Sequence, residues 1–309
     1  MKKKILSFFN ILLIAITLCS CTALSHDDGK INVVTANFPA YCFAKEICGD
    51  NAEVTLLLPL GSESHHYEPT GKDMVKIQKC DLFIYTGSES DAWIDKVLSS
   101  IDSEIKTLKM TDCVKLIEVG HNHDHEENED NHTAEYDEHV WTSPLNAIKI
   151  SEAISKEMQK IDNENAESYK ENTQKYTAEL QSLHNDFVSF FDSIKNKTMV
   201  FGDRFPFVYF AQEYGIEYAS AFPGCADHSE PSASTIAGLI EKINSEKIST
   251  VYHIEFSNMK IANTLSEATG AKIAQIYTCH NVSKEQFESG EDYISLMRAN
   301  LDTLKESMI

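Results

Sequence analysis

The stretch "INVVTANFPAYCFAKEICGDNAEVTLLLP", residues 31–59, decides the fold that we expect for this chain. Residues 31–37 and 52–59 are rich in Val, Ile and Leu and are predicted to be strands, and residues 40–49 between them are predicted to be a helix. A strand, a helix and a second strand in succession form a βαβ unit, in which the two strands lie parallel in one sheet. The stretch therefore predicts an α/β fold.

The same alternation continues along the chain. Further strands are predicted at residues 80–87, 198–202, 216–222, 249–256 and 271–278. Further helices are predicted at residues 72–79, 89–100, 206–214, 232–246, 258–269 and 285–307. We therefore expect an α/β protein with two lobes, each a mainly parallel sheet flanked by helices.

Residues 163–195 differ from both lobes, because they contain neither glycine nor proline and repeat apolar side chains at gaps of three, four and seven. This spacing predicts one long amphipathic helix, which would join the lobes rigidly and limit their hinge motion. The expected organisation is a lipoprotein signal peptide at 1–20, an N-terminal lobe at 21–161, a linking helix at 162–195 and a C-terminal lobe at 196–309.

The N-terminus has the pattern of an export signal. "MKKKILSFFNILLIAITLCSC" places three lysines before an apolar run that is too short for a comfortable membrane span. Its end, residues 18–21, resembles a bacterial lipobox, so we expect a lipid on Cys21; an ordinary signal cleavage nearby is the alternative. A lipid on Cys21 would anchor the chain to the extracytoplasmic face of the membrane without spanning it.

Charge and cysteine spacing argue against several functions but do not decide whether the cysteines form disulfides. The formal net charge of −21 argues against nucleic-acid binding, which requires a basic surface. No Cys-x-x-Cys pair occurs, which argues against a thiolate zinc site or a redox motif. An exported chain permits disulfides, and the six cysteines beyond the N-terminal region allow fifteen connectivities. These cysteines are Cys42, Cys48, Cys80, Cys113, Cys225 and Cys279.

Histidines follow several predicted strands. His65 and His66 come shortly after one strand, His280 follows another, and His139 precedes the helix expected to begin near Pro144. In open parallel sheets, ligands bind beyond the carboxyl ends of the strands. Three imidazoles that converge there from two lobes would suit Zn²⁺, with a carboxylate or water as the fourth ligand. Surface histidines and buried histidines without a metal are the alternatives.

A second group of histidines lies in an acidic segment with no apolar residue to bury, residues 121–132. We expect this segment to be a loop that collects zinc at low affinity, with a solvated spacer as the alternative. Its histidines are His121, His123, His125 and His132.

The motif "PLGSESHHYEP" at 59–69, followed by "DEHVWTSPLNA" at 137–147, resembles the metal-binding substrate-binding lipoproteins of ABC importers, the zinc/manganese type of cluster A-I. The resemblance covers nearly the whole chain after the signal peptide. It implies that His65 and His139 are metal ligands, that His66 is not, and that His280 takes the place of a late acidic ligand.

One position departs from the family pattern. The third ligand of the family, His or Glu, would fall on Arg204, and a guanidinium stays protonated and cannot bind a cation. His280 would then serve as the third ligand, with Asp203 or Glu255 as an oxygen donor or with a water in the place. Arg204 is expected to pair with Glu255.

The resemblance implies a binding protein that captures Zn²⁺ between its lobes and delivers it to an ABC permease driven by a cytoplasmic ATPase. Mn²⁺ is less favoured, because imidazole ligands suit Zn²⁺ better. We expect a monomer that is not an enzyme. The alternatives are a zinc-dependent hydrolase, for which no His-Glu-x-x-His signature is present, and an Mn²⁺-specific binding protein or adhesin on the same fold.

Overall fold

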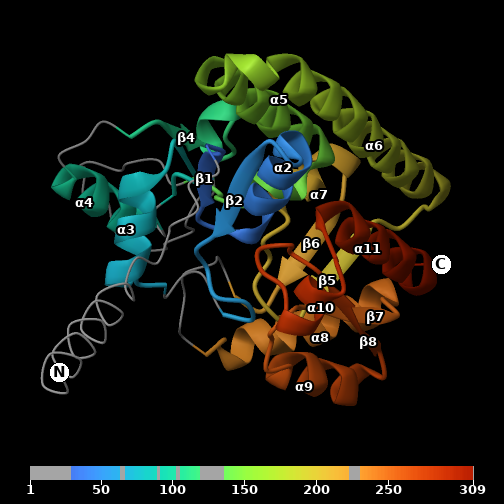
Figure 1. Ribbon diagram of the computed structural model, residues 1–309. Coiled ribbons are helices and arrows are strands. Elements are labelled where there is room, and N and C mark those ends of the chain that lie inside the picture. The colour runs from blue at the N-terminus through green and yellow to red at the C-terminus, as the bar shows by residue number, and fades with distance from the viewer. Residues whose placement is uncertain are drawn as a thin grey trace, which may run out of the picture. The chain divides into compact units, whose positions relative to one another are not determined.

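The strands form two separate parallel sheets, which confirms the predicted two-lobe α/β architecture (Figure 1). The computed structural model describes residues 29–62, 67–88, 91–101, 105–118, 136–222 and 230–308. The first sheet, of order β2-β1-β3-β4, contains β1 (Ile31–Thr35), β2 (Ala52–Leu56), β3 (Leu82–Tyr85) and β4 (Thr107–Lys109). The second sheet, of order β6-β5-β7-β8, contains β5 (Thr198–Phe201), β6 (Glu217–Ser220), β7 (Thr250–Ile254) and β8 (Lys272–Ile276).

The two sheets share one winding pattern. In each sheet the chain first adds a strand on one side of its starting strand and then crosses to the other side. Val33 of β1 therefore has Val54 on one side and Leu82 on the other. Such a reversal is a topological switch point, outside which open α/β sheets bind their ligands. The topology places one switch point between β1 and β3 and another between β5 and β7.

The helices cover these sheets and connect the lobes. In the N-terminal half they are α2 (Phe38–Cys48), α3 (Gly71–Lys79), α4 (Ala92–Ser100), α5 (Pro144–Ile161) and α6 (Ala166–Ser193). In the C-terminal half they are α7 (Val208–Tyr214), α8 (Ala233–Glu246), α9 (Lys260–Thr269), α10 (Lys284–Glu288) and α11 (Tyr293–Ser307).

Local sequence sets the helix ends next to the site. Asn37 caps α2, because its side chain accepts a hydrogen bond from the backbone N–H of Ala40. Ser143 caps α5 in the same way, 3.1 Å from the N–H of Asn146, and Pro144 occupies the first turn. Both helices therefore begin immediately after loops that contribute to the candidate site.

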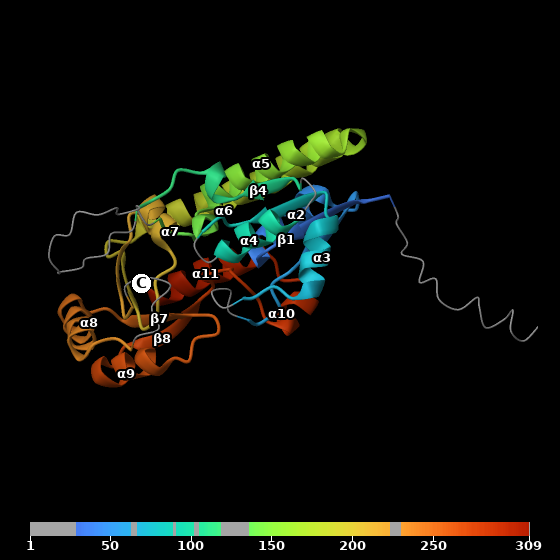
Figure 2. The same cartoon turned by 90° about the vertical axis from the view of Figure 1, so that its left-hand side faces the viewer.

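The predicted amphipathic helix at 163–195 is α6, preceded by a short 3₁₀ turn at Asn163–Asn165. Figures 1 and 2 show α5 and α6 lying side by side. The buried side of α6 also contacts α2 in the N-terminal lobe and α7 and α11 in the C-terminal lobe. Its buried residues recur every three or four positions along one face as far as Phe190, with Phe191 directly after it: Tyr169, Thr173, Tyr176, Leu180, Leu183, Phe187, Phe190 and Phe191.

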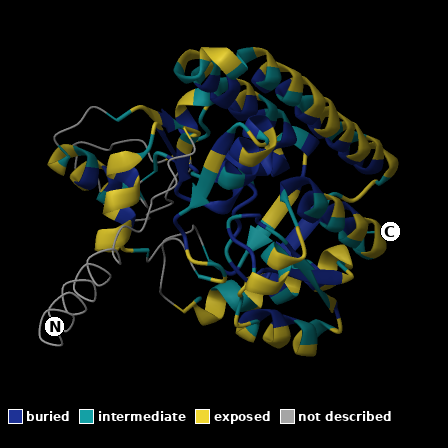
Figure 3. Ribbon diagram, in the orientation of Figure 1, coloured by how far each residue is buried: buried dark blue, intermediate teal, exposed yellow. Residues whose placement is uncertain are grey.

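One apolar core runs through both lobes (Figure 3). It joins Phe43 of α2 and Leu180 of α6 to Phe201 of β5 and Tyr293 of α11. Two smaller clusters lie under α3 and α4 in the first lobe and under α8 and α9 in the second. Because the main core is continuous, the lobes are held together by packing as well as by the chain connection.

The structure differs from the sequence expectations in two places. The single helix expected at 285–307 is two helices, because Gly290 adopts a positive φ of 84° and Asp292 starts α11 with its own capping box. Strand β4 was not expected, because its three residues carry one buried apolar side chain, Leu108. Cys42, Cys48, Cys80, Cys113 and Cys279, which are the cysteines that the structure describes, are free thiols.

Candidate metal site

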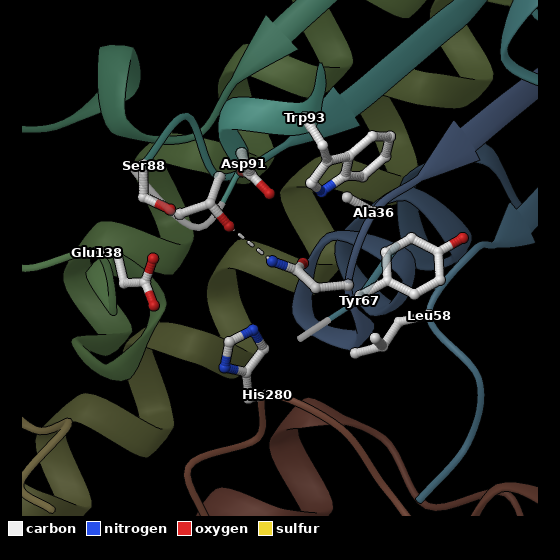
Figure 4. A pocket seen from close by; sticks show the side chains of 10 residues that line it. Ala36, Leu58, Tyr67, Ser88, Asp91, Trp93, Glu138 and His280 are labelled. Carbon is white, nitrogen blue, oxygen red and sulfur yellow. Dashed lines mark hydrogen bonds between the residues drawn. The ribbon is translucent and has the colours of Figure 1, made fainter. Parts of the chain in front are cut away.

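A pocket opens at the carboxyl ends of β1, β2 and β3, beside the switch point of the first sheet (Figure 4). His280 enters it from the loop after β8, so both lobes contribute to one site. Figure 4 shows the imidazole of His280 and the carboxylate of Glu138 projecting into the same space. The lining residues are Ala36, Asn37, Leu58, Tyr67, Thr86, Ser88, Asp91, Trp93, Glu138 and His280.

His139 lies next to this pocket and is held in one orientation. The residue is buried, with 2% exposure. Oδ1 of Asp137 lies 2.9 Å from the backbone N of His139 and 3.2 Å from its Nδ1. Because that carboxylate accepts the Nδ1 proton, the neutral ring has its lone pair on Nε2, the arrangement of metal-binding histidines with a carboxylate behind them. Tyr209 fixes Asp137 in turn by donating its hydroxyl to the Asp137 carbonyl at 2.8 Å.

The two described candidate histidines meet across the lobes. The ring centroids of His139 and His280 are 5.8 Å apart, in an edge-to-face arrangement. Trp141 packs against both, at 5.3 Å from His139 and 4.9 Å from His280. Its Nε1 donates to the carbonyl of Thr278 at 2.9 Å, which ties the 139–141 turn to the His280 loop. The predicted approach of these two histidines is therefore present in the structure.

Glu255 holds the loop that carries His280 through two hydrogen bonds from Thr278. Its Oε2 accepts the Thr278 N–H at 2.7 Å, and its Oε1 accepts the Thr278 hydroxyl at 2.5 Å. The Thr278 hydroxyl oxygen also accepts the N–H of His280 at 3.0 Å. Glu255 is only 6% exposed and does not line the pocket, so its visible contacts position the loop that carries His280.

The other candidates in the second lobe lie away from the pocket lining. Asp203 is 9% exposed, and its Oδ1 accepts the N–H of Arg204 at 3.0 Å. His253, two residues before Glu255 and not a predicted ligand, is also buried, in β7, where its Nδ1 lies 2.9 Å from the carbonyl of Ile254. The pairing of Arg204 with Glu255 stays a prediction.

Several predicted residues lie outside the described part of the chain. They are His65, His66, the loop histidines His121, His123, His125 and His132, and the lipidation residue Cys21. Within the described ranges, no group of three His, Cys, Asp or Glu side chains is close enough to hold a metal ion. The described residues therefore supply part of a coordination shell, and the predicted set with His65 stays a prediction.

Two acidic residues of the pocket were missed by sequence reasoning. Glu138 lies beside His139, with Oε1 3.9 Å from Nε2 of the imidazole. Burial, and to a smaller extent the nearby charge of Glu138, raise the pKa of Asp91 to about 6. The Asp-x-His spacing at 137–139 could have indicated the carboxylate that orients His139, but nothing local marks Asp91 as a pocket residue.

The comparisons with known proteins identify the family. The family described as zinc-uptake complex component A, periplasmic (ZnuA) matches residues 33–307. The chain belongs to this family. It is 35% identical over 298 residues to the zinc-binding lipoprotein AdcA of Streptococcus pneumoniae strain R6, an alignment that covers 96% of this chain and 59% of AdcA. It is 34% identical over 284 residues to the high-affinity zinc uptake system protein ZnuA of Bacillus subtilis strain 168, covering 91% and 88% of the two chains.

Solved structures of ZnuA-family proteins have the same fold. The Zn(II)-bound ZnuA-like domain of S. pneumoniae AdcA matches with a TM-score of 0.76 and 34% identity, over 91% of this chain and 99% of that domain. The metal-dependent lipoprotein YcdH of B. subtilis matches with a TM-score of 0.77 and 31% identity, over 91% and 100%. The present chain spans 59% of the length of full AdcA. In the described part of this chain, no helix is long and apolar enough to cross a membrane.

Proposed function

We propose that this chain is an extracytoplasmic solute-binding protein that captures Zn²⁺ between its lobes and delivers it to an ABC permease for uptake. The observation that carries the proposal is the meeting of His139 and His280, one from each lobe, at the carboxyl ends of the sheets. Membership of the ZnuA family and the zinc-binding names of the relatives support it. Those relatives are binding proteins of zinc uptake rather than enzymes.

The donor chemistry fits Zn²⁺ better than Mn²⁺. His139 presents its Nε2 lone pair because Asp137 holds the Nδ1 proton. The proposed ligand set is His65, His139 and His280, completed by an oxygen donor. Zn²⁺ accepts such a set in tetrahedral geometry, whereas Mn²⁺ prefers a larger share of oxygen ligands.

The finer features of the proposal concern location and delivery. A lipid on Cys21 would hold the protein at the outer face of the membrane, beside its permease and the ATPase that drives it. The protein is proposed to act as a monomer, and the 121–132 segment would collect zinc near the main site. Deleting residues 121–132 should lower uptake when zinc is scarce and leave the affinity of the main site unchanged.

The decisive experiment is metal analysis after equilibration of the protein with mixed Zn²⁺ and Mn²⁺. We expect one tightly bound Zn²⁺ per chain. His65→Ala, His139→Ala and His280→Ala should each lose it, and His66→Ala, the matched control, should retain it. Preferential loading of Mn²⁺, or tight zinc binding that survives His139→Ala, would contradict the proposal.

A further inference from the structure

The Glu138 side chain lies beside the two described histidine candidates of the proposed zinc site. This side chain is 10% exposed, and its Oε1 lies 3.9 Å from Nε2 of His139, the nitrogen that Asp137 leaves available for a metal. The same carboxylate lines the pocket into which His280 projects (Figure 4). Glu138 thus neighbours both described histidine candidates, one from each lobe.

Oε1 of Glu138 and Nε2 of His139 are close enough to bind the same metal ion after a small movement of the Glu138 side chain. Zn²⁺ bonds to imidazole nitrogen and carboxylate oxygen of about 2.0–2.1 Å hold two tetrahedral ligand atoms about 3.3 Å apart. The observed separation of Oε1 and Nε2 is 3.9 Å. A shift of about 0.6 Å, within the reach of one glutamate torsion, would bring both atoms into the same tetrahedral shell.

The other acidic candidates are placed less favourably. Both oxygens of Glu255 accept hydrogen bonds from Thr278, and Oδ1 of Asp203 accepts the N–H of Arg204. Neither Glu255 nor Asp203 lines the pocket. Asp91 does line it, but its Oδ2 accepts the N–H of Gly87 at 2.8 Å, which turns that oxygen toward the backbone.

We propose that Glu138 supplies the oxygen ligand of the bound Zn²⁺ and replaces the ligand that Arg204 cannot provide. The proposal rests on the zinc-binding function proposed above and adds Glu138 to the two described histidine candidates, His139 and His280. A guanidinium at residue 204 leaves the second lobe with His280 as its ligand, so the first lobe supplies two neighbouring residues, Glu138 and His139. The carboxylate also offsets one of the two positive charges that the ion brings into a partly buried site.

Cobalt substitution tests this assignment directly. Co²⁺ replaces Zn²⁺ in tetrahedral sites, and its visible absorption spectrum changes when one of its ligands is exchanged. The spectrum of Co²⁺-loaded Glu138→Gln should therefore differ from that of the wild-type protein. Ser88→Ala is the matched control, because it changes a polar side chain in the lining of the same pocket that is not one of the proposed ligands, and it should keep the wild-type spectrum.

The same variant measures the energetic role of the carboxylate. Glu138→Gln keeps the shape of the side chain, and we expect its Zn²⁺ affinity to fall at least about 10-fold while its zinc-free melting temperature stays near that of the wild type. Unchanged affinity in Glu138→Gln, or a wild-type spectrum of Co²⁺-loaded Glu138→Gln, would overturn the proposal. Failure of the wild-type protein to bind Zn²⁺ would instead refute the proposed function.

Discussion

Glu255 gives the sharpest test of how the His280 loop is held. Both of its oxygens accept hydrogen bonds from Thr278, one from the backbone N–H and one from the hydroxyl. All these groups are buried, so replacing Glu255 by Ala would leave two donors without their acceptor. We expect Glu255→Ala to lower the free energy of unfolding of the zinc-free protein.

The number of hydrogen bonds lost predicts how much stability Glu255→Ala loses. A hydrogen bond to a charged group contributes about 1.5–3 kcal/mol, so losing both predicts a destabilisation of about 3–6 kcal/mol in Glu255→Ala. Glu255→Gln retains one oxygen acceptor for the Thr278 N–H, and its amide can donate to the Thr278 hydroxyl oxygen. We therefore expect Glu255→Gln to cost only about 1–2 kcal/mol. Both values are large against the roughly 5–15 kcal/mol that stabilises a typical domain.

Urea unfolding of zinc-free protein, followed by tryptophan fluorescence, measures this loss. Trp141 is a suitable reporter, because its Nε1 donates to the carbonyl of the same Thr278. The matched control is Glu267→Gln on the exposed side of α9, which should change stability by less than about 0.5 kcal/mol. Zinc-free Glu255→Ala as stable as the wild type would refute the positioning role. If zinc then also failed to stabilise the variant, Glu255 would be a direct ligand instead.

Three further predictions concern the site and its frame. Asp137→Asn should weaken Zn²⁺ binding about 10- to 100-fold in a chelator competition, because the His139 ring loses its orienting carboxylate; unchanged affinity would contradict this role. Gly202→Ala should destabilise the fold by about 1–3 kcal/mol in urea, because a Cβ there would lie 2.5 Å from the Ala262 backbone, whereas Gly238→Ala in open space on α8 should stabilise it by about 0.5–1 kcal/mol. Asp91→Asn should stabilise the zinc-free protein at pH 7.5 by at most about 3 kcal/mol, because burial raises the pKa of that carboxyl from 3.8 to about 6. The Asp91 penalty is complete above pH 6 and absent below pH 3.8, so the wild-type and Asp91→Asn stabilities should converge as the pH falls; a constant difference would contradict this cause.

The sequence predicted the parts of this molecule that depend on local patterns. Each predicted strand is present, because dense β-branched and aliphatic runs such as residues 31–37 leave few alternatives to a buried parallel strand. The topology also explains why His280 could be expected at the site, because it follows β8 and ligands bind beyond the carboxyl ends of parallel strands. His139 precedes α5 instead, so its place at the site was predicted from the resemblance of the 137–147 motif to the family.

The features that sequence reasoning missed depend on contacts between distant segments. Strand β4 exists because the backbone of Thr107–Lys109 pairs with β3, although its own residues have little strand character. Glu138 reads as one more acid in an acidic chain until the fold turns it toward His280. The burial of Asp91 likewise follows from the packing of α4 against the first sheet and from no local pattern.

The proposed Zn²⁺ cargo explains why the pocket is lined by two acidic residues, Asp91 and Glu138. Asp91 and Glu138 line one partly buried space, and their mutual repulsion raises the pKa of Asp91 on top of the effect of burial. This repulsion destabilises the folded protein when no cation is bound. A divalent ion at His139 and Glu138 would instead attract both carboxylates. Binding then stabilises the folded state in proportion to the logarithm of the ion concentration over its dissociation constant. The stabilising effect of Asp91→Asn should therefore be largest in zinc-free protein and should shrink or reverse when zinc is bound, because the neutral amide no longer attracts the ion.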